Sequence, residues 1–192
     1  VRVRKSKLRL LIIAGGPSHD LAFFRTTAEE DPAIAVSAFT QTPAGTFYEG
    51  LLTQAALDSA DCLVLIGMPT TFTHPSTIDA VAGAITRRRL PFLWIGARTV
   101  DVTRSGALAA LLPFTATGAS TAEQEISIEP VPAEQASPLL APIQPGDPSP
   151  WQQLPPIFAT RTHFAAKAGA TVLATARIQS VITPSPVLIV RS

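Results

Sequence analysis

Three short, uninterrupted apolar runs constrain the fold of this chain more than any other feature. They cover residues 10–14, 62–66 and 92–95, and a glycine follows each of them: Gly15, Gly67 and Gly96. Apolar runs of this length without alternation are typical of strands that are buried on both faces of a parallel sheet. A further strand is expected over residues 33–39. The sequence therefore predicts a mostly parallel sheet in the first half of the chain.

The segments between these runs indicate helices. Over residues 75–89 the apolar side chains recur at helical spacing, and the three arginines at its end suit the negative pole of a helix dipole. A second helix is expected over residues 20–30, with Ser18 or His19 near its cap. Strands that alternate with helices predict an α/β fold, a doubly wound sheet with helices on both faces and right-handed crossovers.

The second half of the chain has a different character, because 11 of the 18 prolines lie between Pro130 and Pro186. Proline interrupts helices and central strands, so this half is expected to consist of edge strands and loops. Strands are predicted over residues 123–131, 170–176 and 186–190. Residues 138–156 are interpreted as a packed surface loop rather than an SH3 or WW ligand. Its expected apolar anchors are Leu139, Leu140, Ile143 and Trp151.

Composition narrows the function classes. The 192 residues fit a single domain spanning 1–192, and 46% apolar against 15% charged residues argues against disorder. Fifteen basic and 14 acidic residues give a net charge of +1, which argues against nucleic acid as a partner. The lone Cys62 excludes an internal disulfide and a cysteine-rich metal site. No apolar run approaches the ~20 residues of a membrane span.

The chain does not begin with methionine, and we expect it to be a soluble piece cut from a larger bacterial protein. An anchor elsewhere in that protein would place it at a membrane, so its location stays open.

Ligands of parallel sheets bind beyond the carboxyl ends of the strands, so the candidate site residues come from the three loops after the glycines. Residues 15–20 are glycine-rich and precede a helix, where backbone amides, Ser18 and His19 would cradle an anion. A tight turn that caps the helix is the alternative. Residues 67–74 offer Thr70 and His74, although a histidine before Pro75 is also an ordinary helix start.

The third loop, residues 96–101, lies where a nucleophile elbow would follow a strand. The order of elements, the loop at 15–20 and the Ile95-Gly96-Ala97-Arg98 turn resemble the class I glutamine amidotransferase-like superfamily, including its ThuA-like relatives. The resemblance covers residues 8–112. It implies a flavodoxin-like sheet and, in active members, a cysteine on the elbow with a late histidine and acidic residue.

The chain departs from that pattern at the nucleophile. Arg98 stands at the elbow position and cannot lose its proton, while Cys62 opens an apolar strand instead of ending one. The late histidine, His163, is not followed by an acidic residue at the expected spacing. The resemblance therefore implies a catalytically degenerate member, a binding or interaction module without a cofactor. Its partner would be a small anion or a protein.

Two further alternatives involve the same loops. Arg98 would clasp a carboxylate or phosphate, or would form an ion pair with Asp101 or Glu49. A hydrolase-type enzyme acting on a small substrate would use His19, His74 and His163, with or without a metal that Asp20 would also bind. Thr99 would be its nucleophile, or else would cap a helix that begins near Thr103.

Overall fold

The computed structural model describes residues 7–140 and 149–191, and the chain divides into two compact units. The first extends to Leu111 and the second begins at Leu112. We call them the parallel-sheet unit and the antiparallel unit, after their strands.

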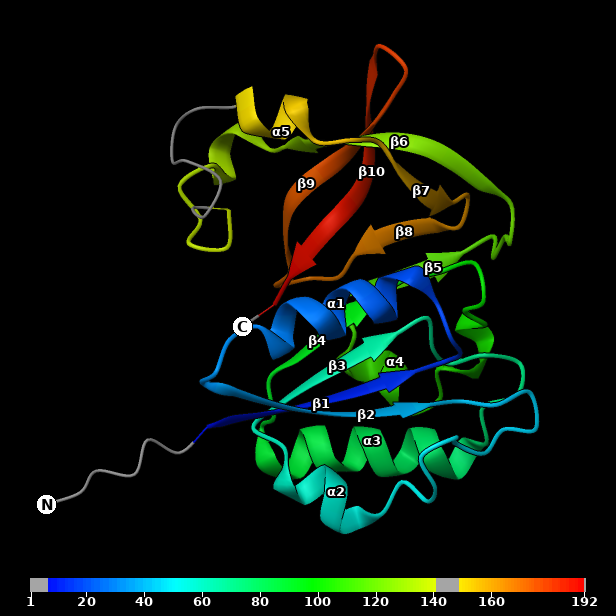
Figure 1. The fold of residues 1–192 in the computed structure, drawn as a ribbon. Helices are drawn as coiled ribbons and strands as arrows, with labels where there is room; N and C mark the ends of the chain where they lie inside the picture. Colours follow the sequence, from blue (N-terminus) through cyan, green and yellow to red (C-terminus); the bar gives the residue numbers. More distant parts are fainter. Residues whose placement is uncertain (1–6, 141–148, 192) are drawn as a thin grey trace, which may run out of the picture. The chain divides into compact units, whose positions relative to one another are not determined.

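Four parallel strands form the centre of the parallel-sheet unit (Figure 1). They are β1 (Leu8–Ala14), β2 (Ile34–Thr40), β3 (Cys62–Ile66) and β4 (Phe92–Ile95). Their order across the sheet is β2-β1-β3-β4, with Leu10 opposite both Val36 and Cys62. Ile12 and Ile13 point to opposite faces of β1 and are both fully buried, so the apolar runs indeed form a parallel sheet that is covered on both sides.

Helices cover both faces of this sheet. α1 (His19–Glu29) lies on one face, and α2 (Gln54–Ser59) and α3 (Pro75–Arg88) lie on the other (Figure 1). α1 packs Leu21, Phe24 and Ala28 against Ile12 and its neighbours in the core. Two of the three helices were predicted from the sequence within a residue or two of their bounds.

The segment after β4 differs from the prediction of a helix near Thr103. Only a three-residue 3-10 helix, η1 (Val102–Arg104), forms there, and a short α4 (Leu108–Leu111) follows. The Asp101 carboxylate accepts a hydrogen bond from the Thr103 amide at 3.1 Å and so caps η1.

The antiparallel unit corrects the expectation that the second half consists of edge strands and loops, because it contains a four-stranded sheet with two central strands. β10 (Val181–Val190), β9 (Thr171–Ile178), β6 (Glu123–Pro130) and β7 (Ile157–Thr160) form one antiparallel sheet in that order. β5 (Phe114–Thr117) and β8 (His163–Ala166) form a second. Three of the predicted strands are present as β6, β9 and β10.

The prolines of this unit sit where strands tolerate them. Pro130 is the last residue of β6, and Pro184 and Pro186 lie in β10, an edge strand with register shifts around Pro186. An edge strand leaves alternate amides unpaired, so a missing N–H costs little there. β10 therefore begins five residues earlier than predicted.

The proline-rich segment 138–156 is described only in part, because residues 141–148, with the predicted anchor Ile143, lie outside the described residues. Leu140 is buried and Leu139 is exposed. A short helix, α5 (Ser149–Gln153), carries the half-buried Trp151, and the 3-10 helix η2 (Pro132–Glu134) precedes the segment. Within residues 7–140 and 149–191, no helix has both the length and the apolar character that crossing a membrane requires.

Candidate functional site

The predicted site lies at the carboxyl edge of the parallel sheet, by which we mean the loops that follow β1 to β4. All four strands run in the same direction, so these loops emerge at the same edge. They comprise residues 15–18, 41–53, 67–74 and 96–101.

The loops after β1 and β3 touch at two glycines. The Gly15 amide donates to the Ile66 carbonyl at 2.9 Å. A Cβ atom at Gly15 would lie 2.2 Å from the Gly67 carbonyl oxygen and 2.6 Å from the Thr70 methyl carbon. Gly15 is thus required for close backbone packing, whereas Gly67 has a φ of +61°, a conformation that favours glycine. Gly16, by contrast, has open space where its Cβ would be.

Thr70 belongs to a buried hydrogen-bonded cluster with Gln41 and Thr73. The Thr70 and Thr73 hydroxyls each lie 2.8 Å from Gln41 Oε1 and donate to it, and the Thr70 amide donates to Thr73 Oγ1 at 2.8 Å. Thr70 is only 4% exposed, and Gln41 and Thr73 are 1% exposed. Thr70 therefore fixes the loop and does not present its hydroxyl to a ligand.

Gln41 was not predicted as a site residue from the sequence, although it directly follows a strand at this edge. The Gln41 amide donates to the Ala14 carbonyl at 2.8 Å, which holds the residue against the end of β1. Its side-chain Nε2 is buried without a hydrogen-bond partner among the described residues. Its position just beyond a predicted strand could have identified it. It was missed because the candidate loops were those that begin with a glycine, and no glycine follows this strand.

The loop after β4 is fixed against the loop after β3. Trp94 Nε1 donates to the Met68 carbonyl at 2.8 Å, the Asp101 amide donates to the Pro69 carbonyl at 2.8 Å, and Thr99 Oγ1 donates to the Gly67 carbonyl at 3.2 Å. The Thr99 hydroxyl is thus committed to a backbone oxygen. It does not cap a helix, because Asp101 has that role.

This loop lacks the backbone form of a nucleophile elbow. An elbow is a strained turn that leads from a strand directly into a helix. Here the Val100 amide donates to the Ala97 carbonyl at 3.1 Å in a turn, and residues 96–101 have no positive φ angle. The chain then enters the three residues of η1.

Arg98 lies on that turn with its side chain exposed. Both acidic residues considered as its partners are engaged elsewhere. Asp101 pairs with Arg104 at 3.5 Å, and the Glu49 carboxylate accepts from the Thr40 amide at 2.7 Å and from its hydroxyl at 2.9 Å. In the described part of the chain, no carboxylate lies within salt-bridge distance of Arg98.

Ser18 and His74 serve as helix caps. Ser18 Oγ accepts from the Leu21 amide at 3.1 Å at the start of α1. His74 Nδ1 accepts from the Ser76 amide at 3.2 Å at the start of α3 and lies 2.7 Å from the Ser76 hydroxyl. Both side chains therefore satisfy amides that the helix itself leaves unpaired.

The three histidines are distributed over different elements. His19 is the exposed first residue of α1, whereas His163 is the exposed first residue of β8, opposite Thr117 in the antiparallel unit. Across the described ranges, no three His, Cys, Asp or Glu side chains form a group that could hold a metal ion.

Cys62 lies at the amino end of β3, whereas the candidate loops follow the carboxyl ends. It is half-buried, and this burial raises the pKa of its thiol. The neutral thiol is a poor nucleophile, because the thiolate is the reactive form.

Comparison with known proteins adds no family to this geometry. No protein-family model matches the chain, and no curated protein matches it.

Proposed function

We propose that this chain is a non-catalytic, amidotransferase-like binding domain whose carboxyl edge takes a small anion, or the acidic group of a protein partner, through Arg98. The observation that carries the proposal is the exposed Arg98 without an acidic partner among the described residues. Arginine stays charged at any physiological pH, and its planar fork matches a carboxylate or phosphate.

The sheet topology supports this place for a ligand. The order β2-β1-β3-β4 equals the first four positions of the flavodoxin-like order 2-1-3-4-5. In such sheets ligands bind where the strand order reverses, between β1 and β3. The loops 15–18 and 67–74 follow those two strands, and the loop of Arg98 is joined to the second of them through Thr99 and Gly67.

The state of the possible nucleophiles supports a non-catalytic role. Thr99 Oγ1 donates to a backbone carbonyl, and the Thr70 hydroxyl is buried against Gln41. Cys62 lies at the amino end of β3, away from the loops of the carboxyl edge, and burial raises the pKa of its thiol. None of these three has a histidine as its hydrogen-bond partner in the described structure, whereas an activated nucleophile requires a base within hydrogen-bond reach.

Thermal unfolding with phosphate and with succinate tests anion binding, with chloride at equal ionic strength as the reference. A ligand that binds only the native state raises the melting temperature. We expect both anions to stabilise the wild type, Arg98→Ala to lose this effect, and Arg87→Ala to retain it. Arg87 is a matched control because it is exposed, near the end of α3, and makes only a long 3.8 Å pair with Asp58. A stabilisation that survives Arg98→Ala would refute the role of Arg98.

A glutamine hydrolysis assay tests the other half of the proposal. We expect no ammonia release above that of a heat-denatured sample. Hydrolysis that Arg98→Ala or His163→Ala abolishes would show that the chain is an enzyme.

A further inference from the structure

The outer edge of β2 is unprotected in the middle of the strand. β2 pairs with β1 on one side, and no strand of the described chain pairs with its other side. Its seven residues, Ile-Ala-Val-Ser-Ala-Phe-Thr, include no charge and no proline. Natural edge strands are usually guarded by such residues, as the prolines of β10 illustrate. The unguarded middle of this edge is a template for another strand.

The backbone groups at this edge are free only in the middle of the strand. At the two ends they are used, because the Thr40 amide donates to Glu49, the Thr40 carbonyl accepts from Tyr48, and the Ile34 amide donates to Asp31. Outward-facing groups alternate along a strand, so those of Val36 and Ala38 also face outward. No hydrogen bond of these four groups is found in the described structure.

We infer that β2 pairs antiparallel with β2 of a second copy of this chain, about a two-fold axis through Ser37. This axis places Val36 of each copy opposite Ala38 of the other, so that the four free N–H and C=O groups of each strand form four hydrogen bonds with those of its partner. Ser37 faces its own counterpart as a non-hydrogen-bonded pair. The strand is therefore complementary to itself.

The side chains fit the same register. Ala35 of one copy lies opposite Phe39 of the other, so a small side chain meets a large one at both ends. No like charges meet along the strand, because β2 has none. Like charges directly opposite each other would oppose the pairing.

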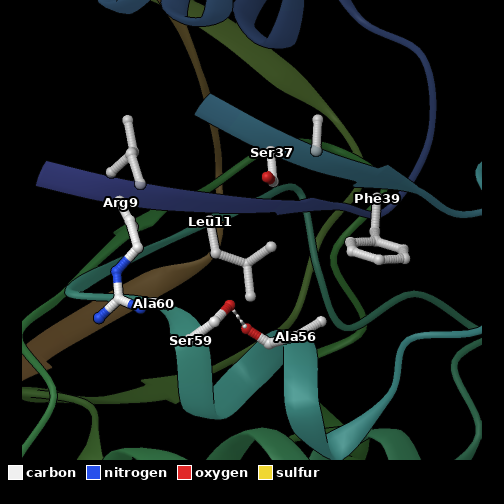
Figure 2. A pocket seen from close by; sticks show the side chains of 9 residues that line it. Arg9, Leu11, Ser37, Phe39, Ala56, Ser59 and Ala60 are labelled. Carbon is white, nitrogen blue, oxygen red and sulfur yellow. Dashed lines mark hydrogen bonds between the residues drawn. The ribbon is translucent and has the colours of Figure 1, made fainter. Parts of the chain in front are cut away.

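A groove lies beside β2 on the face of the sheet that α2 partly covers. Figure 2 shows Ser37 and Phe39 pointing from β2 toward Ala56 and Ser59 of α2, with Leu11 between them. The groove has a volume of about 360 Å³. It exists because α2 has only six residues and leaves part of this face of the sheet uncovered. A second copy at the β2 edge would extend the sheet that forms one wall of the groove.

Introducing a charge at Ser37 tests the axis. Ser37 is exposed, so Ser37→Lys and Ser37→Glu leave the core intact. By sedimentation equilibrium of the full chain we expect a wild-type dimer, and we expect each variant to raise its dissociation constant about tenfold or more, because like charges meet at the axis. A mixture of the two variants should recover the dimer, since Lys then faces Glu. Leu93→Lys, on the opposite edge strand β4, is the control and should remain dimeric.

Disulfide capture provides a second readout that does not depend on charge. A non-hydrogen-bonded antiparallel pair has Cα atoms ~4.5 Å apart, within the range that a disulfide spans. Ser37→Cys in a Cys62→Ser background should therefore form a covalent dimer on oxidation, and Ser59→Cys in the same background should not. A wild-type monomer at every concentration would overturn the inference. So would a dimer that neither Ser37 charge weakens and that Ser37→Cys does not cross-link.

Discussion

Replacing Gly15 by alanine tests whether the loops of the candidate site are locked together as the structure shows. The new Cβ would lie 2.2 Å from the Gly67 carbonyl oxygen, which is 1.2 Å short of the 3.4 Å at which ordinary contact begins. Neither backbone segment can move away easily, because both are held by hydrogen bonds. The Gly15 amide donates to the Ile66 carbonyl and the Gly67 amide donates to the Ile95 carbonyl, both at 2.9 Å. Overpacking of this kind costs about 1–3 kcal/mol, and we expect about 3 kcal/mol because backbone atoms clash.

Gly16→Ala is the matched control, one residue along the same loop. Its Cβ would meet nothing within 4 Å, and Gly16 has no positive φ angle. Such a substitution reduces the entropy of the unfolded chain, so we expect it to stabilise the protein by about 0.5 kcal/mol.

Urea unfolding followed by tryptophan fluorescence separates the two outcomes. The chain has two tryptophans, and a Trp151→Phe background leaves only Trp94. Trp94 lies in the parallel-sheet unit and donates to the Met68 carbonyl, in the loop that Gly15 contacts. Equal free energies of unfolding for the two alanine variants would show that the Gly15 contact is not tight. So would a decrease below about 0.5 kcal/mol in Gly15→Ala, because surface substitutions without a clash have effects of that size.

Three further perturbations have defined outcomes. Hydrogen bonds from Arg9 hold the pKa of the Asp61 carboxyl well below its usual value of 3.8. The contribution of this ion pair to the free energy of unfolding is therefore complete above pH ~4 and decreases as the pH falls below ~4. Urea unfolding at pH 6 and pH 2.5 should show a smaller loss in Asp61→Asn than in the wild type, and an equal loss would contradict this. Burial raises the pKa of Cys62, so native alkylation by iodoacetamide should reach half its maximal rate above pH ~8.5, and a lower midpoint would indicate an activated thiol. Thr99→Val should cost about 1 kcal/mol by removing the hydrogen bond to Gly67, whereas Thr99→Ser should restore it, and an equal loss in both variants would show that this bond contributes nothing.

The parallel sheet could be predicted because burial on both faces leaves a direct trace in the sequence. Fully buried runs such as those around Ile12 and Val64 allow no polar side chain. α2 was not predicted because its six residues bury only Leu57, which leaves no periodicity. The four-residue strands β5, β7 and β8 are too short for an alternating pattern to stand out, and their pairing depends on partners far along the chain.

The common edge at which the candidate loops emerge could also be predicted, but the hydrogen bonding and burial of their side chains could not. Parallel strands alone dictate that the loops of Ser18, Thr70 and Arg98 emerge at one edge. Thr70 is buried because Gln41, 29 residues earlier in the chain, accepts its hydrogen bond. Among the described residues Arg98 has no acidic partner, and the two carboxylates considered for that role, Asp101 and Glu49, bind Arg104 and Thr40 instead. Such competition among side chains is decided by tertiary packing.

The most direct test of the proposed function is an amide chemical-shift titration of the ¹⁵N-labelled chain with inorganic phosphate. We expect saturable shifts at residues 97–100, no shift at Arg87, and loss of the response in Arg98→Ala. A wild type without saturable shifts at residues 97–100, or an unchanged response in Arg98→Ala, would contradict anion binding through Arg98.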